Sequence, residues 1–156
     1  MNNNDVIRRT RYTFEFEDSK MIELFALGGK EVTRAQVSDW LKKEDDPEYK
    51  KIDDEHLATF LNGLIIEKRG KKEGPQPVAE KRLNNNIILR KLKIALNLKD
   101  EDIIEILKLA RFLLGKHELS AFFRNPGQSQ YRLLKDQILR NFLHGMQIKY
   151  HPNSKE

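Results

Sequence analysis

The chain of 156 residues contains no cysteine, a single tryptophan and no long hydrophobic run. Without cysteine there is no disulfide, no thiolate nucleophile and no cysteine-ligated metal or cluster. No apolar run approaches the roughly 18 residues of a membrane-spanning helix. The polar amino terminus also lacks the apolar stretch of a secretory signal. We therefore expect a cytoplasmic protein without a membrane segment.

Charged residues make up 34% of the chain, and the formal net charge is +5. The charge is unevenly distributed. Residues 1–68 hold 11 Lys and Arg against 15 Asp and Glu, whereas residues 69–82 hold 5 against 2 and residues 83–156 hold 13 against 7. The positive charge therefore lies in the connector and the second half, which makes nucleic acid a candidate partner.

The sequence repeats itself at a spacing of 82 positions, without a gap. Residues 2–68 align with residues 84–150, and sixteen of the 67 aligned pairs are identical. The openings NNNDVIRRTRYTF and NNNIILRKLKIAL match, as do the endings LATFLNGLII and LRNFLHGMQI. A shared register over the whole length indicates a tandem duplication.

Helical periodicity dominates within each repeat, and no segment alternates as a strand does. We expect four helices per repeat. In the first repeat they run from about Asn4 to Phe16, from an N-cap at Asp18, from about Thr33, and from about Asp54 to Lys68. The predicted fold is all-α, with two tandem, duplicated four-helix units packed together. The units cover residues 1–68 and 83–156, joined by a linker at 69–82.

Small units of this size have marginal cores, so we expect the two repeats to pack against each other, about a pseudo-twofold axis. Gly63 and Gly145 stand at equivalent helical positions, where glycine costs about 1 kcal/mol relative to alanine. We therefore expect each to allow the close approach of a neighbouring helix. An asparagine triplet precedes the first helix of each repeat. One asparagine of each triplet is explained as an N-cap, and the other two are not.

Sequence signatures of enzymes are absent. GKKEGP lacks the G-K-[ST] of a phosphate-binding loop, and His117-Glu118 has no second histidine one turn later. The acidic stretch from Glu44 to Glu55 lacks the glycine and ligand spacing of a calcium loop, and we interpret it as a solvated turn with Asp53 or Asp54 capping the next helix. We therefore expect no enzymatic activity, no cofactor and no metal site.

Basic residues recur at equivalent positions of the first helix in each repeat, on the side opposite its apolar face. One interpretation is a solvated helix face. The other is a phosphate-contacting surface, extended by lysines of the linker. The candidate phosphate-contacting residues are Arg8, Arg9, Arg11, Lys71, Lys72, Arg90, Lys91 and Lys93.

Residues 18–43 resemble a helix-turn-helix, although the turn is a residue or two long and an acidic run follows it. Two functions stay open. The first is a non-catalytic binding or adaptor module, whose acidic first half meets a basic protein or another copy of the chain. The alternative is a nucleic-acid-binding protein with a helix-turn-helix-like element, using the basic second repeat and linker. The partner and the oligomeric state are not determined by the sequence.

Together, the paired openings NNNDVIRRTRY and NNNIILRKLKIAL, the segment IELFALGGKEVTRAQVSDWLKKEDD and FLNGLIIEKRGK resemble the YehS-like family. These are small bacterial proteins of unknown function with a duplicated DUF1456 domain. The resemblance covers essentially the whole chain and implies a duplicated helical domain in the bacterial cytoplasm. It implies no catalytic residue, ligand or substrate. The second repeat has Ala110 and Arg111 where the first has Gly28 and Gly29, so its second helix is expected to end differently.

Overall fold

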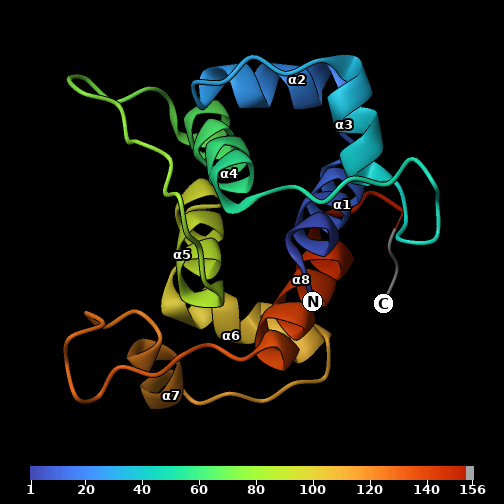
Figure 1. Ribbon diagram of the computed structural model, residues 1–156. Coiled ribbons are helices and arrows are strands. Elements are labelled where there is room, and N and C mark those ends of the chain that lie inside the picture. The colour runs from blue at the N-terminus through green and yellow to red at the C-terminus, as the bar shows by residue number, and fades with distance from the viewer. Residues whose placement is uncertain (154–156) are drawn as a thin grey trace.

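The computed structural model describes residues 1–153, and within them the chain forms eight α-helices and no strand (Figure 1). The helices are α1 (Asn3–Phe14), α2 (Asp18–Leu27), α3 (Arg34–Leu41), α4 (Asp54–Arg69), α5 (Asn85–Ala95), α6 (Asp100–Leu109), α7 (Lys116–Ala121) and α8 (Asp136–Tyr150). The predicted all-α, duplicated fold is confirmed, with α1–α4 as the first repeat and α5–α8 as the second. Residues 154–156, the end of the second predicted repeat, lie outside the described part.

Side-chain caps begin several helices where the sequence predicts them. The Asn2 side chain accepts a hydrogen bond from the backbone N–H of Asp5, and Asp53 accepts one from the backbone N–H of His56. Such caps satisfy N–H groups that have no partner within the helix. The expected N-cap at Asp18 is wrong, because Asp18 is the first residue of α2 and Glu17 holds the cap position without a side-chain bond. Asp18 instead places a negative charge in the first turn, which the helix dipole favours.

Gly63 and Gly145 lie where helices cross closely within each repeat. A Cβ at Gly63 would stand 1.8 Å from the carbonyl oxygen of Leu24, and one at Gly145 would stand 2.0 Å from that of Ile106. Both distances are far below van der Waals contact, so only glycine permits the crossings of α2 with α4 and of α6 with α8. The predicted packing role of the two glycines is confirmed.

The second helix ends at the same position in both repeats, although the sequences differ there. α2 ends at Leu27 and α6 at Leu109. Gly29 follows with φ +109°, and the equivalent Arg111 adopts a left-handed conformation with φ 61°. The expectation that the second repeat ends this helix differently is therefore wrong: Arg111 takes a conformation that favours glycine and carries its strain.

The two repeats pack reciprocally, as expected for a pseudo-twofold arrangement. The fourth helix of each repeat lies against the first helix of the other, so α4 packs on α5 and α8 packs on α1 (Figure 1). Buried side chains of both repeats belong to one hydrophobic cluster. Each repeat thus completes the core of the other, which a unit of this size needs for stability.

Among the helices of residues 1–153, none combines the length and the apolarity that a membrane crossing requires.

Candidate anion-binding site

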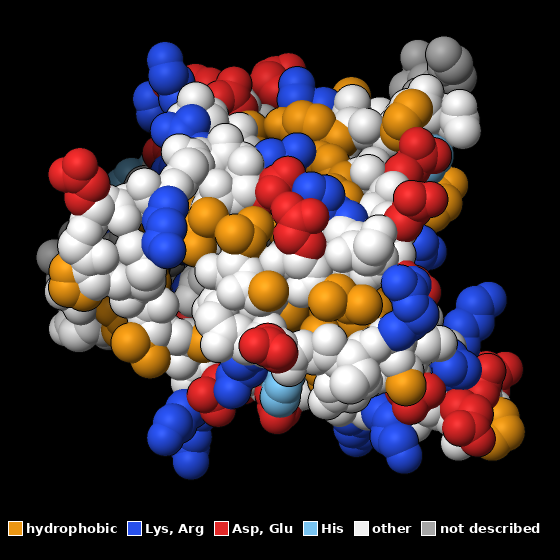
Figure 2. Space-filling model, turned by 90° about the horizontal axis from the view of Figure 1, so that it is seen from above, with side chains coloured by type: hydrophobic (Ala, Val, Ile, Leu, Met, Phe, Trp, Pro, Cys, Tyr) orange, Lys and Arg blue, Asp and Glu red, His pale blue; other side chains and the backbone are white. Residues whose placement is uncertain are grey.

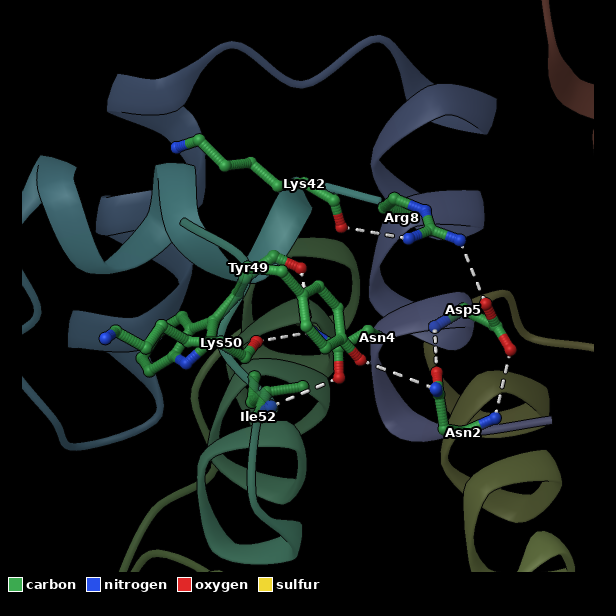
Figure 3. A network of polar contacts seen from close by, with 9 residues as sticks. Asn2, Asn4, Asp5, Arg8, Lys42, Tyr49, Lys50 and Ile52 are labelled. Atoms are coloured by element: carbon green, nitrogen blue, oxygen red, sulfur yellow. Dashed lines mark hydrogen bonds and ion pairs between the residues drawn. The ribbon is translucent and has the colours of Figure 1, made fainter. Parts of the chain in front are cut away.

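Asparagines of the first triplet fix the start of α1 against the loop between α3 and α4, and Figure 3 shows Asn2 and Asn4 among them. The Asn4 amide donates to the backbone oxygens of Trp40 and Lys50 at 2.9 and 2.8 Å, and its oxygen accepts from the backbone N–H of Ile52 at 3.2 Å. Asn3 donates to the backbone oxygen of Ile52 at 3.2 Å. The two asparagines that the capping role left unexplained therefore hold the α3–α4 loop.

Arg8 belongs to the same polar network and is engaged within it. Its guanidinium donates to the Asp5 carboxylate at 2.9 Å and to the backbone oxygen of Lys42 at 3.1 Å (Figure 3). The side chain thus ties α1 to the end of α3. Within the basic triplet of the first repeat, Arg8 therefore has a structural role, because its hydrogen bonds join two helices.

A pocket of about 480 Å³ opens where α1 meets α8. This arginine pocket is lined by four arginines, by one carboxylate and by three other residues: Arg8, Arg9, Arg11, Arg140, Asp5, Met1, Tyr12 and Leu143. All eight come from the start of the first repeat or from α8 of the second, so the reciprocal packing of the repeats builds the pocket. The whole predicted basic triplet of the first repeat lies in its wall.

The arginine pocket has an excess of positive charge that its own residues do not neutralise. Among residues 1–153, Asp5 is the only carboxylate that lines the pocket, and it is already bonded to Arg8. Burial lowers the pKa of the Arg9 guanidinium, while the nearby charge of Asp5 acts in the opposite direction. Within residues 1–153, the buried Nε of Arg11 finds no hydrogen-bond partner. Partly desolvated guanidinium groups of this kind gain from a bound anion, because arginine matches phosphate and carboxylate with two parallel hydrogen bonds.

The basic triplet of the second repeat is arranged differently from that of the first. The Lys91 side chain is 10% exposed, and its Nζ lies 3.0 Å from Glu80 and donates to Asn62 at 2.6 Å. Lys93 pairs with Asp100 at 2.8 Å. The interpretation of this helix side as a solvated or phosphate-contacting face does not hold for Lys91, because α4 of the other repeat covers it.

The remaining candidates do not extend the arginine pocket. Arg90 is half-buried in the wall of a second pocket between α4 and α5, and Lys72 lines the same pocket from the linker. Lys71 is exposed on the linker. Arg8, Arg9 and Arg11 thus line the arginine pocket, and Lys72, Arg90 and Lys91 line the second pocket. Lys71 and Lys93 line neither pocket.

The helix-turn-helix interpretation gains no support from the local contacts of α3. Gln36 is bonded to the Thr33 cap, and Arg34 pairs with Asp18 at 3.5 Å. In the second repeat the equivalent helix α7 has only six residues. Over the face that carries α2 and α3, acidic and basic side chains alternate with apolar ones and form no basic patch (Figure 2).

Five of the eight residues that line the arginine pocket were not among the predicted candidates, and two of these, Arg140 and Tyr12, carry a cationic or aromatic side chain. Arg140 and Tyr12 lie on the two sides of the α1–α8 junction. The Tyr12 side chain is 46% exposed, and its ring stacks on His151 with centroids 4.2 Å apart. Tyr12 follows the basic triplet directly and could have been considered with it. No local signal identifies Arg140, because its place depends on how the repeats dock. Within residues 1–153, histidines and carboxylates form no cluster of three or more that could hold a metal ion.

Comparison with known proteins confirms the duplication and identifies a family whose function is unknown. The family described as a protein of unknown function (DUF1456) matches the chain twice, over residues 3–70 and 85–151. The uncharacterized protein YehS of Escherichia coli (strain K12) is 41% identical over 152 residues, which cover 97% of each chain. No solved structure matches.

Proposed function

This chain belongs to the DUF1456 family of proteins of unknown function, and we propose that it is a non-catalytic binding protein that holds phosphate groups of nucleic acid in the arginine pocket between α1 and α8. The observation that carries the proposal is the convergence of four arginines on one pocket with a single, already paired carboxylate. Guanidinium groups bind phosphate through paired hydrogen bonds. A cytoplasmic location belongs to the same proposal.

Tyr12 supports a nucleic-acid ligand over a bare anion. Tyr12 is 46% exposed and lines the arginine pocket, and its ring is stacked against that of His151. Exposed aromatic rings beside cationic grooves are where unpaired bases stack, with about 1–3 kcal/mol per base. We therefore propose a single-stranded segment, with its phosphates on Arg9, Arg11 and Arg140 and a base against Tyr12.

The side chains that line the arginine pocket favour binding over catalysis. Arginine stays protonated at neutral pH and cannot serve as a general base. The one carboxylate, Asp5, accepts hydrogen bonds from Arg8 and from the backbone N–H of Asn2. With its oxygens engaged in these bonds, Asp5 has a structural role in the capping of α1.

The test is binding of fluorescent single-stranded DNA and RNA at about 50 and 200 mM salt, a range over which phosphate-driven affinity falls steeply. We expect Arg11→Gln/Arg140→Gln to weaken binding at least about tenfold and to reduce the salt slope by about one per lost phosphate contact. The control Arg132→Gln/Lys149→Gln removes the same charge from exposed positions of the second repeat outside the pocket.

Three results would decide the matter. Loss of binding in the pocket variant with retention in the control supports the proposal. Equal loss in both variants would mean that net charge, and not the pocket, attracts the ligand. Absence of binding by the native protein at the lower salt concentration would end the nucleic-acid proposal.

A second candidate function, contact with another copy of the chain, is favoured by a groove beside α7. Leu133 lines this groove with Leu114 and Ile138, and its side chain is 67% exposed. The first repeat has Lys51 at the position of Leu133. We expect Leu133→Lys to abolish any self-association seen by sedimentation velocity, with Lys51→Gln as a control. A native protein that sediments as a monomer would contradict this second function.

A further inference from the structure

A second pocket lies at the other junction of the repeats, between α4, the linker and α5. Its volume is about 410 Å³. The four positions of α5 that line it, which are Ile87, Arg90, Lys91 and Ile94, are equivalent to Asp5, Arg8, Arg9 and Tyr12 of the arginine pocket. The duplication thus places the same helix positions at both junctions. At this junction, isoleucine stands at two of the four positions and residues of the linker line the wall, so we name it the linker pocket.

Lys91 is the buried cation of the linker pocket. Its Nζ donates to the Asn62 side-chain oxygen at 2.6 Å and lies 3.0 Å from one oxygen of Glu80 in the linker. A charged lysine that is only 8% exposed needs such partners, since burial of an unpaired charge is costly. The carboxylate that neutralises it comes from the linker and not from a helix.

Asn62 provides a donor that nothing in the described part of the chain uses. The residue is 3% exposed, and its Nδ2 has no hydrogen-bond partner within residues 1–153. Because the Asn62 oxygen accepts from Lys91, the orientation of the amide is fixed with Nδ2 as the remaining donor. A buried donor without a partner costs about 1–3 kcal/mol, and such groups are rare in folded proteins.

We propose that the linker pocket binds a small amphipathic carboxylate. One carboxylate oxygen accepts from Lys91 and the other from the unused Nδ2 of Asn62, so the ligand satisfies both donors where Glu80 meets only Lys91. The hydrocarbon part lies against Ile65, Ile87 and Ile94, which line the same pocket. In the absence of the ligand, the Glu80 carboxylate occupies the ligand's place beside Lys91. The ligand carboxylate displaces Glu80 from Lys91 when it binds.

This inference goes beyond the proposed function, because it concerns the α4–α5 junction and not the arginine pocket. Either site can fail its test without affecting the other. Phosphate binding at α1–α8 depends on Arg9, Arg11 and Arg140, none of which lines the linker pocket.

The probe series is butyrate, hexanoate, octanoate and decanoate, titrated into the full-length protein by isothermal calorimetry at constant ionic strength. We expect affinity to rise roughly threefold to fourfold per methylene, as burial of each methylene in an apolar pocket predicts. Octanol and octylammonium, which carry the same chain without the anion, should bind at least about tenfold more weakly than octanoate. Octanol binding equal to that of octanoate would overturn the assignment of the carboxylate to Lys91.

Variants locate the site. Glu80→Gln removes the internal competitor, and we expect octanoate to bind about tenfold more tightly, a gain that misfolding cannot imitate. Ile94→Glu changes an exposed wall residue and should abolish binding without disturbing the core, and Lys91→Met should abolish it as well. The control Lys81→Gln alters an exposed linker residue outside the pocket. Unchanged affinity in both Glu80→Gln and Ile94→Glu would overturn the proposal.

Discussion

Asp54 and Asp136 stand at equivalent positions of the two repeats, and each accepts a hydrogen bond from the backbone of the other repeat. The N–H of Leu83 donates to Asp54 at 2.8 Å, and the amino terminus at Met1 donates to Asp136 at 3.4 Å. Leu83 and Met1 are themselves equivalent under the 82-residue shift. The bonds are therefore related by the pseudo-twofold arrangement, and each repeat begins by binding the fourth helix of its neighbour.

The same correspondence holds for the buried asparagines. Asn86 donates to the backbone oxygens of Phe122 and Arg132 and accepts from the N–H of Leu134, the three bonds that Asn4 makes in the first repeat. Asn86→Ala leaves two buried carbonyl groups and one N–H without their partner. We expect a loss of about 3 kcal/mol in the free energy of unfolding, measured by urea denaturation.

The matched control for that variant is Asn84→Ala. Asn84 caps α5 by accepting from the backbone N–H of Ile87 and is exposed. Loss of an N-cap costs about 1 kcal/mol. If the two variants lose equal stability, the buried network contributes no more than an exposed cap, and the role assigned to Asn86 is wrong.

Glycine-to-alanine substitution at the helix crossings should destabilise the fold, although alanine is the better helix former. At Gly63 and Gly145 the new Cβ would meet a backbone oxygen at 1.8 and 2.0 Å, and backbone cannot rotate away as a side chain can. We expect each variant to lose at least about 2 kcal/mol in thermal or urea unfolding. Gly127→Ala is the control, because a Cβ there has nothing within 4 Å, and its stability should change by no more than about 0.5 kcal/mol. If Gly63→Ala instead stabilises the protein, the higher helix propensity of alanine outweighs the steric clash at the helix crossing.

Features that depend on neighbouring residues along the chain were predictable from the sequence. The duplication, the eight helices found within residues 1–153 and the packing role of Gly63 follow from periodicity and from residue types with few alternatives. The cap of α4 was predicted as Asp53 or Asp54, and the structure shows Asp53. The error at Asp18 has a simple cause. An aspartate near a helix start serves equally as a cap or as a first-turn charge, and the sequence does not distinguish the two.

Features that depend on the docking of the two repeats were not predictable. Helical periodicity places Lys91 on the polar side of its helix, but the neighbouring repeat covers that side. The same docking brings Arg140 to the α1 arginines, across a separation that no local pattern records. The third asparagine of each triplet likewise finds its partners 36 to 48 residues away. Long-range contacts of this kind determine which residues come together in the two candidate sites.

Arg111 offers a test of strain at the end of α6. A φ of 61° costs a residue with a side chain about 1–2 kcal/mol. The equivalent residue of the first repeat is Gly29, which adopts a positive φ without this cost. We expect Arg111→Gly to raise the free energy of unfolding by about 1 kcal/mol, measured by urea denaturation. Lys108→Gly, within the same helix, should instead lower it by about 1 kcal/mol. Destabilisation by both substitutions would show that Arg111 makes a contact that outweighs its strain.

The Asn85–Asp136 hydrogen bond should make the free energy of unfolding depend on pH in the acidic range. Asn85 donates to Asp136 at 2.7 Å, and this bond is the main cause that lowers the pKa of the Asp136 carboxyl; partial burial opposes it and the charge of the amino terminus adds to it. A carboxyl with a lowered pKa stabilises the fold above its unfolded value of about 4, and this contribution is lost as the pH falls through the folded value. Asn85→Ala should therefore cost more stability at pH 7 than at pH 3, in urea denaturation at constant ionic strength.

Asn84→Ala, whose bond goes to a backbone N–H that does not titrate, should cost the same at both pH values. A constant deficit in Asn85→Ala across this range would mean that the bond to Asp136 does not distinguish its charged form.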